Sequence, residues 1–139
     1  MRSLFLSSIL AGALLAAAGC GPGGNAPGAA GKQKVIGAAL LTQTHIFYQD
    51  MVKAMREEAE RQGFRLQIQY AEFDSRRQND QMDTFIAQRV DAIIVAPTDS
   101  SGITPVIAEA RNKGIPVFTA DIAAHGADVV CHIASDNEK

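Results

Sequence analysis

From residue 34 onward, short apolar runs alternate with longer amphipathic segments, and this alternation limits the possible folds more than any other feature. "VIGAALLT" and "DAIIVAP" (residues 35–42 and 91–97) are continuously apolar, as strands covered on both faces are. "RLQIQYAEF" (residues 65–73) alternates apolar and polar residues, which is typical of a strand with one wetter face. "IPVFTAD" and "ADVVCHIAS" (residues 115–121 and 127–135) predict two further strands. The order β-α-β-α-β-α-β-β implies right-handed crossovers and a parallel sheet, and therefore an α/β, Rossmann-like lobe.

The first segment between strands has the period of a helix. Apolar residues recur four apart at Phe47, Met51, Met55 and Ala59, and they predict one buried helix face. Gly63 follows this segment, as a glycine commonly does directly after a helix.

The second and third helical segments also have start and stop signals. Either Asp74 or Ser75 is suited to cap the second helix, whose apolar side holds Met82, Phe85 and Ile86. The third segment, "TDSSGITPVIAEARNKG", closes at a glycine. Its three candidate caps are Asp99, Ser100 and Ser101.

Residues 1–20, "MRSLFLSSILAGALLAAAGC", do not fit the domain pattern. One positive charge, an apolar stretch and small residues before a Cys are typical of a secretory signal, and the stretch is short for a membrane span. The ending "AAGC" resembles the bacterial lipobox, which implies cleavage before Cys20 and a lipid on its sulfur. Ala17 departs from that motif, which most often has Leu there. An ordinary secretory signal with an incidental Cys is the alternative.

A Gly-, Ala- and Pro-rich stretch, "GPGGNAPGAAGKQK" (residues 21–34), follows the signal and predicts a flexible linker. Residues 35–139 then form the predicted ligand-binding domain. With Cys20 acylated, Cys131 would have no partner for an intrachain disulfide, because the chain has two Cys residues. The apolar run "DVVCHIA" predicts that Cys131 is a small, buried apolar side chain.

The composition narrows the classes of function. The chain has 139 residues, 47% of them hydrophobic and 20% charged, which fits one ordinary globular domain. Its net charge is −2 and its basic residues are scattered, which argues against a nucleic-acid partner. We find no G-x-S-x-G, Walker-type phosphate loop or H-E-x-x-H motif, so we expect no enzyme and no cofactor. We expect His125 to be a surface residue, and Cys131 and His132 to point to opposite faces of a strand, which disfavours a metal site.

Function is expected at one edge of the sheet. In open α/β sheets, ligands bind outside the carboxyl ends of the strands, where helix N-termini also point. Four polar segments follow the first four strands: "TQTHIFY", "EFDSRR", "APTDSS" and "ADIAAHG". His45, Phe47 and Tyr48 are therefore expected at the ligand edge.

The same segments resemble the periplasmic sugar-binding proteins of the ribose-binding type, the solute receptors of ABC transporters. "DAIIVAPTDSSG", "NKGIPVFTAD" and "HIASDN" carry the resemblance, which runs from about residue 34 to the end. It implies the type I periplasmic binding protein fold. It also implies reversible capture of a small sugar-like solute between two lobes that close by a hinge, and delivery to a membrane permease. With the signal and linker, it implies a lipid-anchored protein on the periplasmic or cell-surface side of the cytoplasmic membrane.

The resemblance also implies site residues. Phe47 and Tyr48 stand where the family places aromatics that stack on a sugar ring, His45 where it often has Asn, and Asp121 where an Asp accepts hydrogen bonds from sugar hydroxyls. Two alternatives stay open. Phe47 is also suited to be the first core residue of its helix, and Asp121 to be a turn residue bonded to nearby backbone.

Two positions depart from the ribose-binding pattern. Ile122 replaces an Arg, and Ala96 replaces an Asn that precedes the proline of the third-strand loop. An unpaired hydroxyl in a buried site costs about 1–3 kcal/mol, so ribose fits poorly. A deoxy or methylated sugar, or a more apolar solute, fits better.

Members of the family have two lobes and about twice this length, so the chain is expected to be an incomplete first lobe without the second. A fragment of a longer product and a truncated gene are both compatible with this. A sensor that feeds a membrane receptor or kinase, without transport, is the main alternative to an importer. An enzyme acting at the same sheet edge is a third.

Overall fold

The computed structural model describes residues 32–135. The predicted signal, with Cys20, and most of the predicted linker lie outside the described residues, so lipidation and the domain boundaries at 20 and 34 stay predictions. Within the part of the chain that the structure describes, no helix has the length and apolar character needed to span a bilayer.

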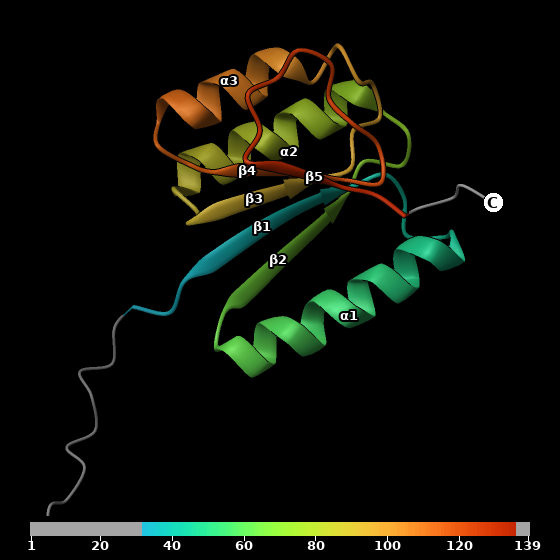
Figure 1. Cartoon of the computed structure of the whole chain (residues 1–139), viewed down its shortest axis with the longest axis vertical. Helices are drawn as coiled ribbons and strands as arrows, with labels where there is room; N and C mark the ends of the chain where they lie inside the picture. Colours follow the sequence, from blue (N-terminus) through green and yellow to red (C-terminus); the bar gives the residue numbers. More distant parts are fainter. Residues whose placement is uncertain (1–31, 136–139) are drawn as a thin grey trace, which may run out of the picture. The chain divides into compact units, whose positions relative to one another are not determined.

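A single five-stranded sheet organises the described residues, and all of its strands are parallel (Figure 1). The spatial order of the strands is β2-β1-β3-β4-β5. The predicted α/β fold with a parallel sheet is therefore confirmed. The strands are β1 (Val35–Leu40), β2 (Arg65–Tyr70), β3 (Ala92–Val95), β4 (Val117–Ala120) and β5 (Cys131–Ile133).

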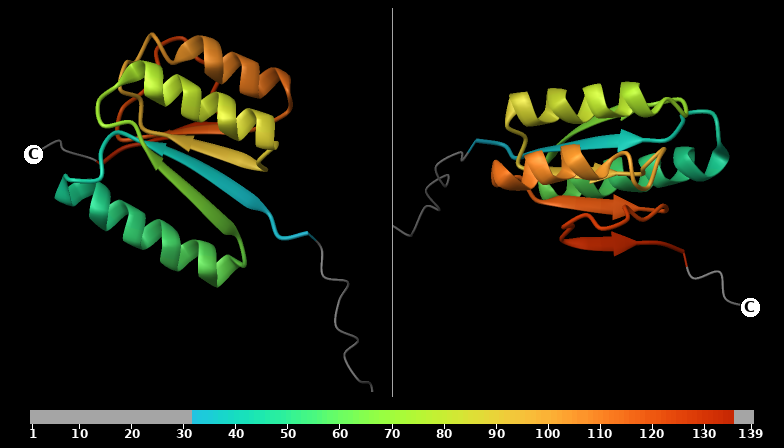
Figure 2. Two further views of the ribbon diagram at one scale, coloured as in Figure 1. Left: turned by 180° about the vertical axis from the view of Figure 1, so that it is seen from behind. Right: turned by 90° about the horizontal axis from the view of Figure 1, so that it is seen from above.

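Three helices cover the sheet unequally. They are α1 (Ile46–Gln62), α2 (Ser75–Gln88) and α3 (Thr104–Asn112). Figures 1 and 2 show α2 and α3 side by side on one face of the sheet, and α1 alone on the other.

The ends of the helices follow the local sequence. His45 caps α1, which ends at Gly63 with a left-handed φ of 73°. Of the two predicted caps of α2, Asp74 is the one used: its carboxylate accepts hydrogen bonds from the backbone of Arg76 and Arg77. The third helix begins differently from the prediction, because no side chain caps α3. The Asp99 carboxylate instead accepts the backbone N–H groups of the two residues before Ile103, in the turn that leads into the helix.

The face beneath α2 and α3 is closed and tightly packed. Met82 and Phe85 of α2 are fully buried, with Ile93 of β3 and Ile107 of α3 around them. Gly37 of β1 lies directly under the Phe85 ring: a Cβ atom at that position would stand 2.6 Å from the nearest ring carbon. Only glycine allows the helix to approach the sheet this closely.

The face beneath α1 is only partly closed. Leu40, Tyr48 and Val52 are buried in a smaller cluster. Ile36 and Ile94, on neighbouring strands, are half-buried and line a groove of about 480 Å³ beside α1. One helix is too narrow to cover this side of the sheet.

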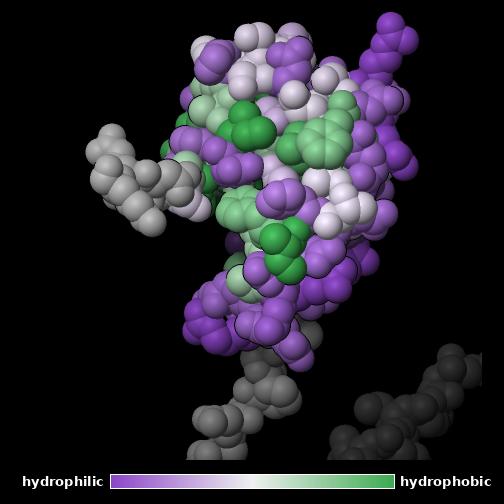
Figure 3. Space-filling model, turned by 90° about the vertical axis from the view of Figure 1, so that its right-hand side faces the viewer, coloured by the Kyte–Doolittle hydropathy of each residue, from purple (hydrophilic) through white to green (hydrophobic). Residues whose placement is uncertain are grey.

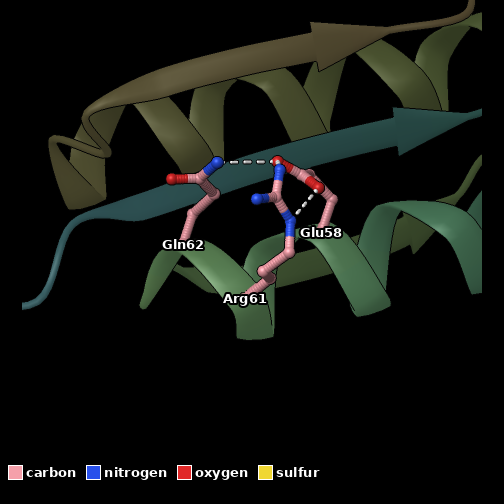
Figure 4. A network of polar contacts seen from close by, with 3 residues as sticks. All are labelled: Glu58, Arg61 and Gln62. Carbon is pink, nitrogen blue, oxygen red and sulfur yellow. Dashed lines mark hydrogen bonds and ion pairs between the residues drawn. The ribbon is translucent and has the colours of Figure 1, made fainter.

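An exposed polar network lies at the end of α1 (Figure 4). The Glu58 carboxylate pairs with Arg61 at 2.6 Å and accepts a hydrogen bond from the Gln62 amide at 2.8 Å. The hydrogen bond from Gln62 lowers the pKa of the Glu58 carboxyl the most, and the bond from Arg61 adds to this effect. Glu58 and Gln62 also border the groove beside α1, so its rim is polar.

The buried stripe of α1 differs from the predicted one. Ala59 is buried and the two methionines are half-buried, but Phe47 is 36% exposed and Tyr48 is 4% exposed. The prediction that Phe47 begins the core face is therefore wrong. Tyr48 takes that place because its ring packs into the small cluster while its hydroxyl reaches the sheet edge.

The last strand also differs from the prediction. β5 has three residues, all exposed, and it is an edge strand. The prediction of a buried Cys131 is therefore wrong, since this thiol is free and exposed. His132 points to the other face of the strand, as predicted, and its Nδ1 lies 3.0 Å from the hydroxyl of Thr119.

Candidate functional site

The predicted ligand edge is assembled from loops at the carboxyl ends of the strands. Because the strands are parallel, the loops after β1, β2, β3 and β4 all emerge at one end of the sheet (Figure 1). A hydrogen bond of 2.7 Å joins the first and the last of them: the Tyr48 hydroxyl donates to Asp121 Oδ2. Two residues that are 73 positions apart in the sequence are thus brought together, as the prediction of a shared site requires.

Asp121 holds an unusual backbone position directly after β4. Its φ of 65° is left-handed, a conformation that Asp tolerates better than most residues do. Its N–H donates to the carbonyl of Ile133 on β5 at 2.8 Å. The backbone is therefore fixed by the sheet while the carboxylate is exposed at the ligand edge, with one oxygen held by Tyr48.

The Tyr48 side chain has a buried ring and a polar end. Burial, and then the hydrogen bond and negative charge of Asp121, raise the pKa of the Tyr48 hydroxyl above its ordinary value of 10.0. The hydroxyl is therefore a donor at all physiological pH values. This geometry makes Tyr48 a residue that orients a carboxylate rather than one that offers its ring face to a ligand.

Phe47 is the exposed aromatic of the pair. Its ring meets the Tyr48 ring edge-on, with centroids 5.3 Å apart and an interplanar angle of 87°. Such a contact holds an exposed ring in one orientation. Of the two aromatics, Phe47 is the one whose surface is open to a partner at this edge.

His45 has both a structural and a chemical role. Its Nδ1 accepts the backbone N–H of Phe47 at 3.3 Å, which caps α1. In the neutral ring, the proton then lies on Nε2. Among the described residues Nε2 has no hydrogen-bond partner, so the exposed edge of the ring offers one donor.

Ala96 and Ile122, the two predicted apolar replacements, are placed differently. Ala96 is fully buried in the cluster that holds Tyr48. A small side chain there leaves room for the tyrosine ring. Ile122 is half-buried and follows Asp121 at the edge.

A buried glutamine that the sequence analysis missed supports the loop after β3. Gln78 is fully buried; its amide donates to the carbonyl of Ala96 at 2.8 Å, and its Oε1 accepts the backbone N–H of Thr98 at 2.8 Å. Both ends of the amide are thus used to fix this loop to α2. Its position four residues before Met82, on the apolar side of α2, was the available signal.

A second set of supporting hydrogen bonds, which the sequence analysis also missed, joins the loops after β1 and β2. The Glu72 carboxylate accepts the hydroxyl of Thr42 at 2.8 Å and the backbone N–H of Gln43 at 3.2 Å. Glu72 and Phe73 both have left-handed φ angles, 52° and 63°. Consecutive non-glycine residues in that region have no clear sequence signature, so this turn was not predicted.

The remaining candidates are not brought into this site. His125 lies in the exposed loop between β4 and β5, and its backbone bonds to Ser100 and Thr104. Within residues 32–135, no group of His, Cys, Asp and Glu side chains is arranged to hold a metal ion. A hollow of about 690 Å³, which includes Arg89 and Lys113 in its lining, lies at the opposite edge and contains no predicted site residue.

Comparison with known families agrees with this fold. Residues 36–139 match the family model described as "periplasmic binding protein domain". The chain belongs to this family. Within it, the chain is of the ribose-binding type that its sequence resembles.

Other members of the periplasmic binding protein family are similar to part of this chain. The ribose import binding protein of Bacillus subtilis is 35% identical over 108 residues, which are 78% of this chain and 35% of that protein. A solute-binding protein of an ABC transporter from Bacillus halodurans, solved with bound myo-inositol, is 33% identical with a TM-score of 0.68; the match covers 75% of this chain and 37% of that one.

A third relative belongs to a signalling protein. The fructose-binding periplasmic domain of a hybrid two-component system is 26% identical with a TM-score of 0.71, over 76% of this chain and 35% of that one. In each of these comparisons the chain spans about a third of the relative's length.

Proposed function

We propose that this chain supplies one lobe of an extracytoplasmic receptor that captures a small sugar-like ligand for an ABC importer. The main observation behind this proposal is the Tyr48–Asp121 hydrogen bond. It holds a carboxylate at the carboxyl edge of the sheet, beside the exposed ring of Phe47. Family membership supports the proposal, as do the sugars and the polyol named for its relatives.

Each residue has a defined role in this proposal. The oxygen of Asp121 that Tyr48 does not hold accepts a ligand hydroxyl in a charge-assisted hydrogen bond. Phe47 covers the apolar C–H face of the sugar ring, and His45 donates from Nε2. Tyr48 fixes the carboxylate, so that less freedom is lost when the ligand binds. No covalent step is involved, because the proposed event is reversible binding rather than catalysis.

The lipid anchor belongs to the same proposal. Acylation at Cys20 would keep the receptor at the outer side of the cytoplasmic membrane, close to its permease. The family name supports an extracytoplasmic location. Intact mass measurement of the mature protein from membranes tests the anchor directly, since an unmodified Cys20 would contradict it.

A sensor is the second candidate. The similarity to the periplasmic domain of a hybrid two-component system favours it, because that relative binds a sugar to signal. Binding at the lobe is the same in both cases. Deleting the chain's gene separates them: loss of uptake of a labelled ligand supports the importer, and loss of a transcriptional response with intact uptake supports the sensor.

Asp121→Asn tests the site. Asn tolerates the left-handed backbone and still accepts from Tyr48, so the substitution removes mainly the charge. We expect at least about a tenfold loss of affinity, measured by NMR titration of the full chain with ribose, xylose, galactose and myo-inositol, because a charge-assisted bond becomes a neutral one. Asp83→Ala, an exposed carboxylate on α2, is the matched control. Unchanged affinity in Asp121→Asn would remove Asp121 from the site.

A further inference from the structure

The carboxyl edge of the sheet carries more exposed apolar surface than a single stacking ring explains. Of the five exposed large apolar side chains among residues 32–135, three lie in the segments that follow β1 and β2: Phe73 at 67%, Ile46 at 65% and Phe47 at 36%. Figure 3 views this end of the molecule and shows hydrophobic side chains set among hydrophilic ones. Neither Ile46 nor Phe73 belongs to a described core cluster.

The backbone presents Phe73 at a conformational cost. Its φ is 63° and that of Glu72 is 52°, and a bulky residue rarely adopts this left-handed region. Such strain persists only where the surrounding structure enforces it, and it concentrates at functional sites. A Phe at this position is therefore disfavoured by its backbone, and its exposed side chain does not offset that cost by burial.

The surrounding bonds do enforce this turn. The Phe73 N–H donates to the carbonyl of Leu41 at 3.2 Å, and Asp74 N–H donates to Ala71 at 3.1 Å. The Glu72 carboxylate holds the loop after β1, as described above. The turn after β2 and the loop that leads to Ile46 and Phe47 are thus one bonded unit, which projects Phe73 outward at the ligand edge.

The sheet order sets the separation between this ring and the proposed carboxylate. Phe73 follows β2 and Asp121 follows β4, which are three strand positions apart in the order β2-β1-β3-β4. Neighbouring strands are about 4.8 Å apart, so the two strand ends are separated by roughly 14 Å. This is wider than one sugar ring, and a sugar with a ring-sized substituent spans it.

We propose that Phe73, with Ile46, contacts an aryl or alkyl substituent of the ligand, while Phe47 and Asp121 hold its sugar-like ring. The preferred ligand class is then a glycoside with an apolar aglycone rather than a free sugar. This inference rests on the proposed function, because it extends the same site along the edge of the sheet.

Matched glycosides test the inference. The probes are the methyl and phenyl β-D-galactopyranosides and the methyl and phenyl β-D-xylopyranosides, titrated by NMR into the full chain. We expect each phenyl glycoside to bind about tenfold more tightly than its methyl partner, as burial of one aromatic contact provides. In Phe73→Asn, which suits the left-handed backbone, this ratio falls to about twofold or less while methyl glycoside binding is unchanged.

Val130→Ala is the matched control, because Val130 is 50% exposed but precedes β5, at the amino ends of the strands. It leaves the phenyl-to-methyl ratio unchanged if the inference is correct. Three results would overturn the inference and leave the proposed function standing: equal binding of both glycosides, a ratio that survives in Phe73→Asn, or a ratio that also falls in Val130→Ala. Absence of binding by all four glycosides and by ribose, xylose, galactose and myo-inositol overturns both.

Discussion

The two faces of this sheet are built from the same five strands but packed to different degrees. Under α2 and α3, Phe85, Met82 and Ile93 are 0% exposed, and Gly37 lets the helix approach the strand directly. Under α1, Ile36 and Ile94 stay half-buried beside an open groove. From this difference we infer that one face provides most of the stability of the lobe. The other face carries Tyr48 and the residues that support the site.

The largest effect is expected from Phe85→Ala. Removing a fully buried ring leaves a cavity on the closed face, and such changes cost about 3–5 kcal/mol of unfolding free energy. Urea denaturation followed by circular dichroism measures it. A loss below about 1 kcal/mol would mean that the closed face is not the main source of stability. The contrast drawn above between the two faces of the sheet would then be wrong.

Gly37→Ala adds an atom to the same contact. The new Cβ would stand 2.6 Å from the Phe85 ring, so the ring must shift, and overpacking of this kind costs about 1–3 kcal/mol. Phe85→Leu made in the same chain should restore part of the loss. If the losses of unfolding free energy are additive in the double variant, residues 37 and 85 are not in tight contact in solution.

Tyr48→Phe tests the polar link between α1 and Asp121, on the far side of the ligand edge. We expect a loss of about 1 kcal/mol at neutral pH, since a buried hydroxyl and its hydrogen bond to an exposed carboxylate are removed.

The dependence on pH sharpens this prediction. The folded-state pKa of Tyr48 is raised, so its contribution is complete below the unfolded pKa and is lost as the pH rises toward the folded one. The difference between wild type and Tyr48→Phe should therefore narrow above a pH of about 10. A constant difference from pH 7 to 11 would contradict the role given to the hydroxyl.

Met55→Ala should have the smallest effect. Met55 is half-buried on the groove side of α1, so its removal creates little enclosed space and should cost less than about 1 kcal/mol. The same denaturation experiment compares it with Phe85→Ala. Equal losses would show that the two faces are packed alike in solution.

Local sequence signals predicted the sheet and most helix ends because those depend on neighbouring residues. Gly63 was identified by its position alone, and Asp74 as one of two candidate caps. Phe47 rather than Tyr48 was predicted to begin the buried face, because either gives α1 an apolar stripe and the contact of Tyr48 with the distant Asp121 is not visible in the local sequence. Cys131 was misplaced because the sequence of a strand does not reveal that it lies at the sheet edge.

The pairing of β1 with β3 has a consequence for how this lobe folds. β1 comes first in the chain and lies inside the sheet, yet its bond from Val35 to Asp91 spans 56 residues. Pairings of such long range form slowly, because a long loop must close before they contribute. During synthesis or export, the apolar edge of β1 therefore stays open until β3 has emerged. Unpaired strand edges of this kind are prone to aggregation, so β3 has a protective role that its place in the finished sheet does not reveal.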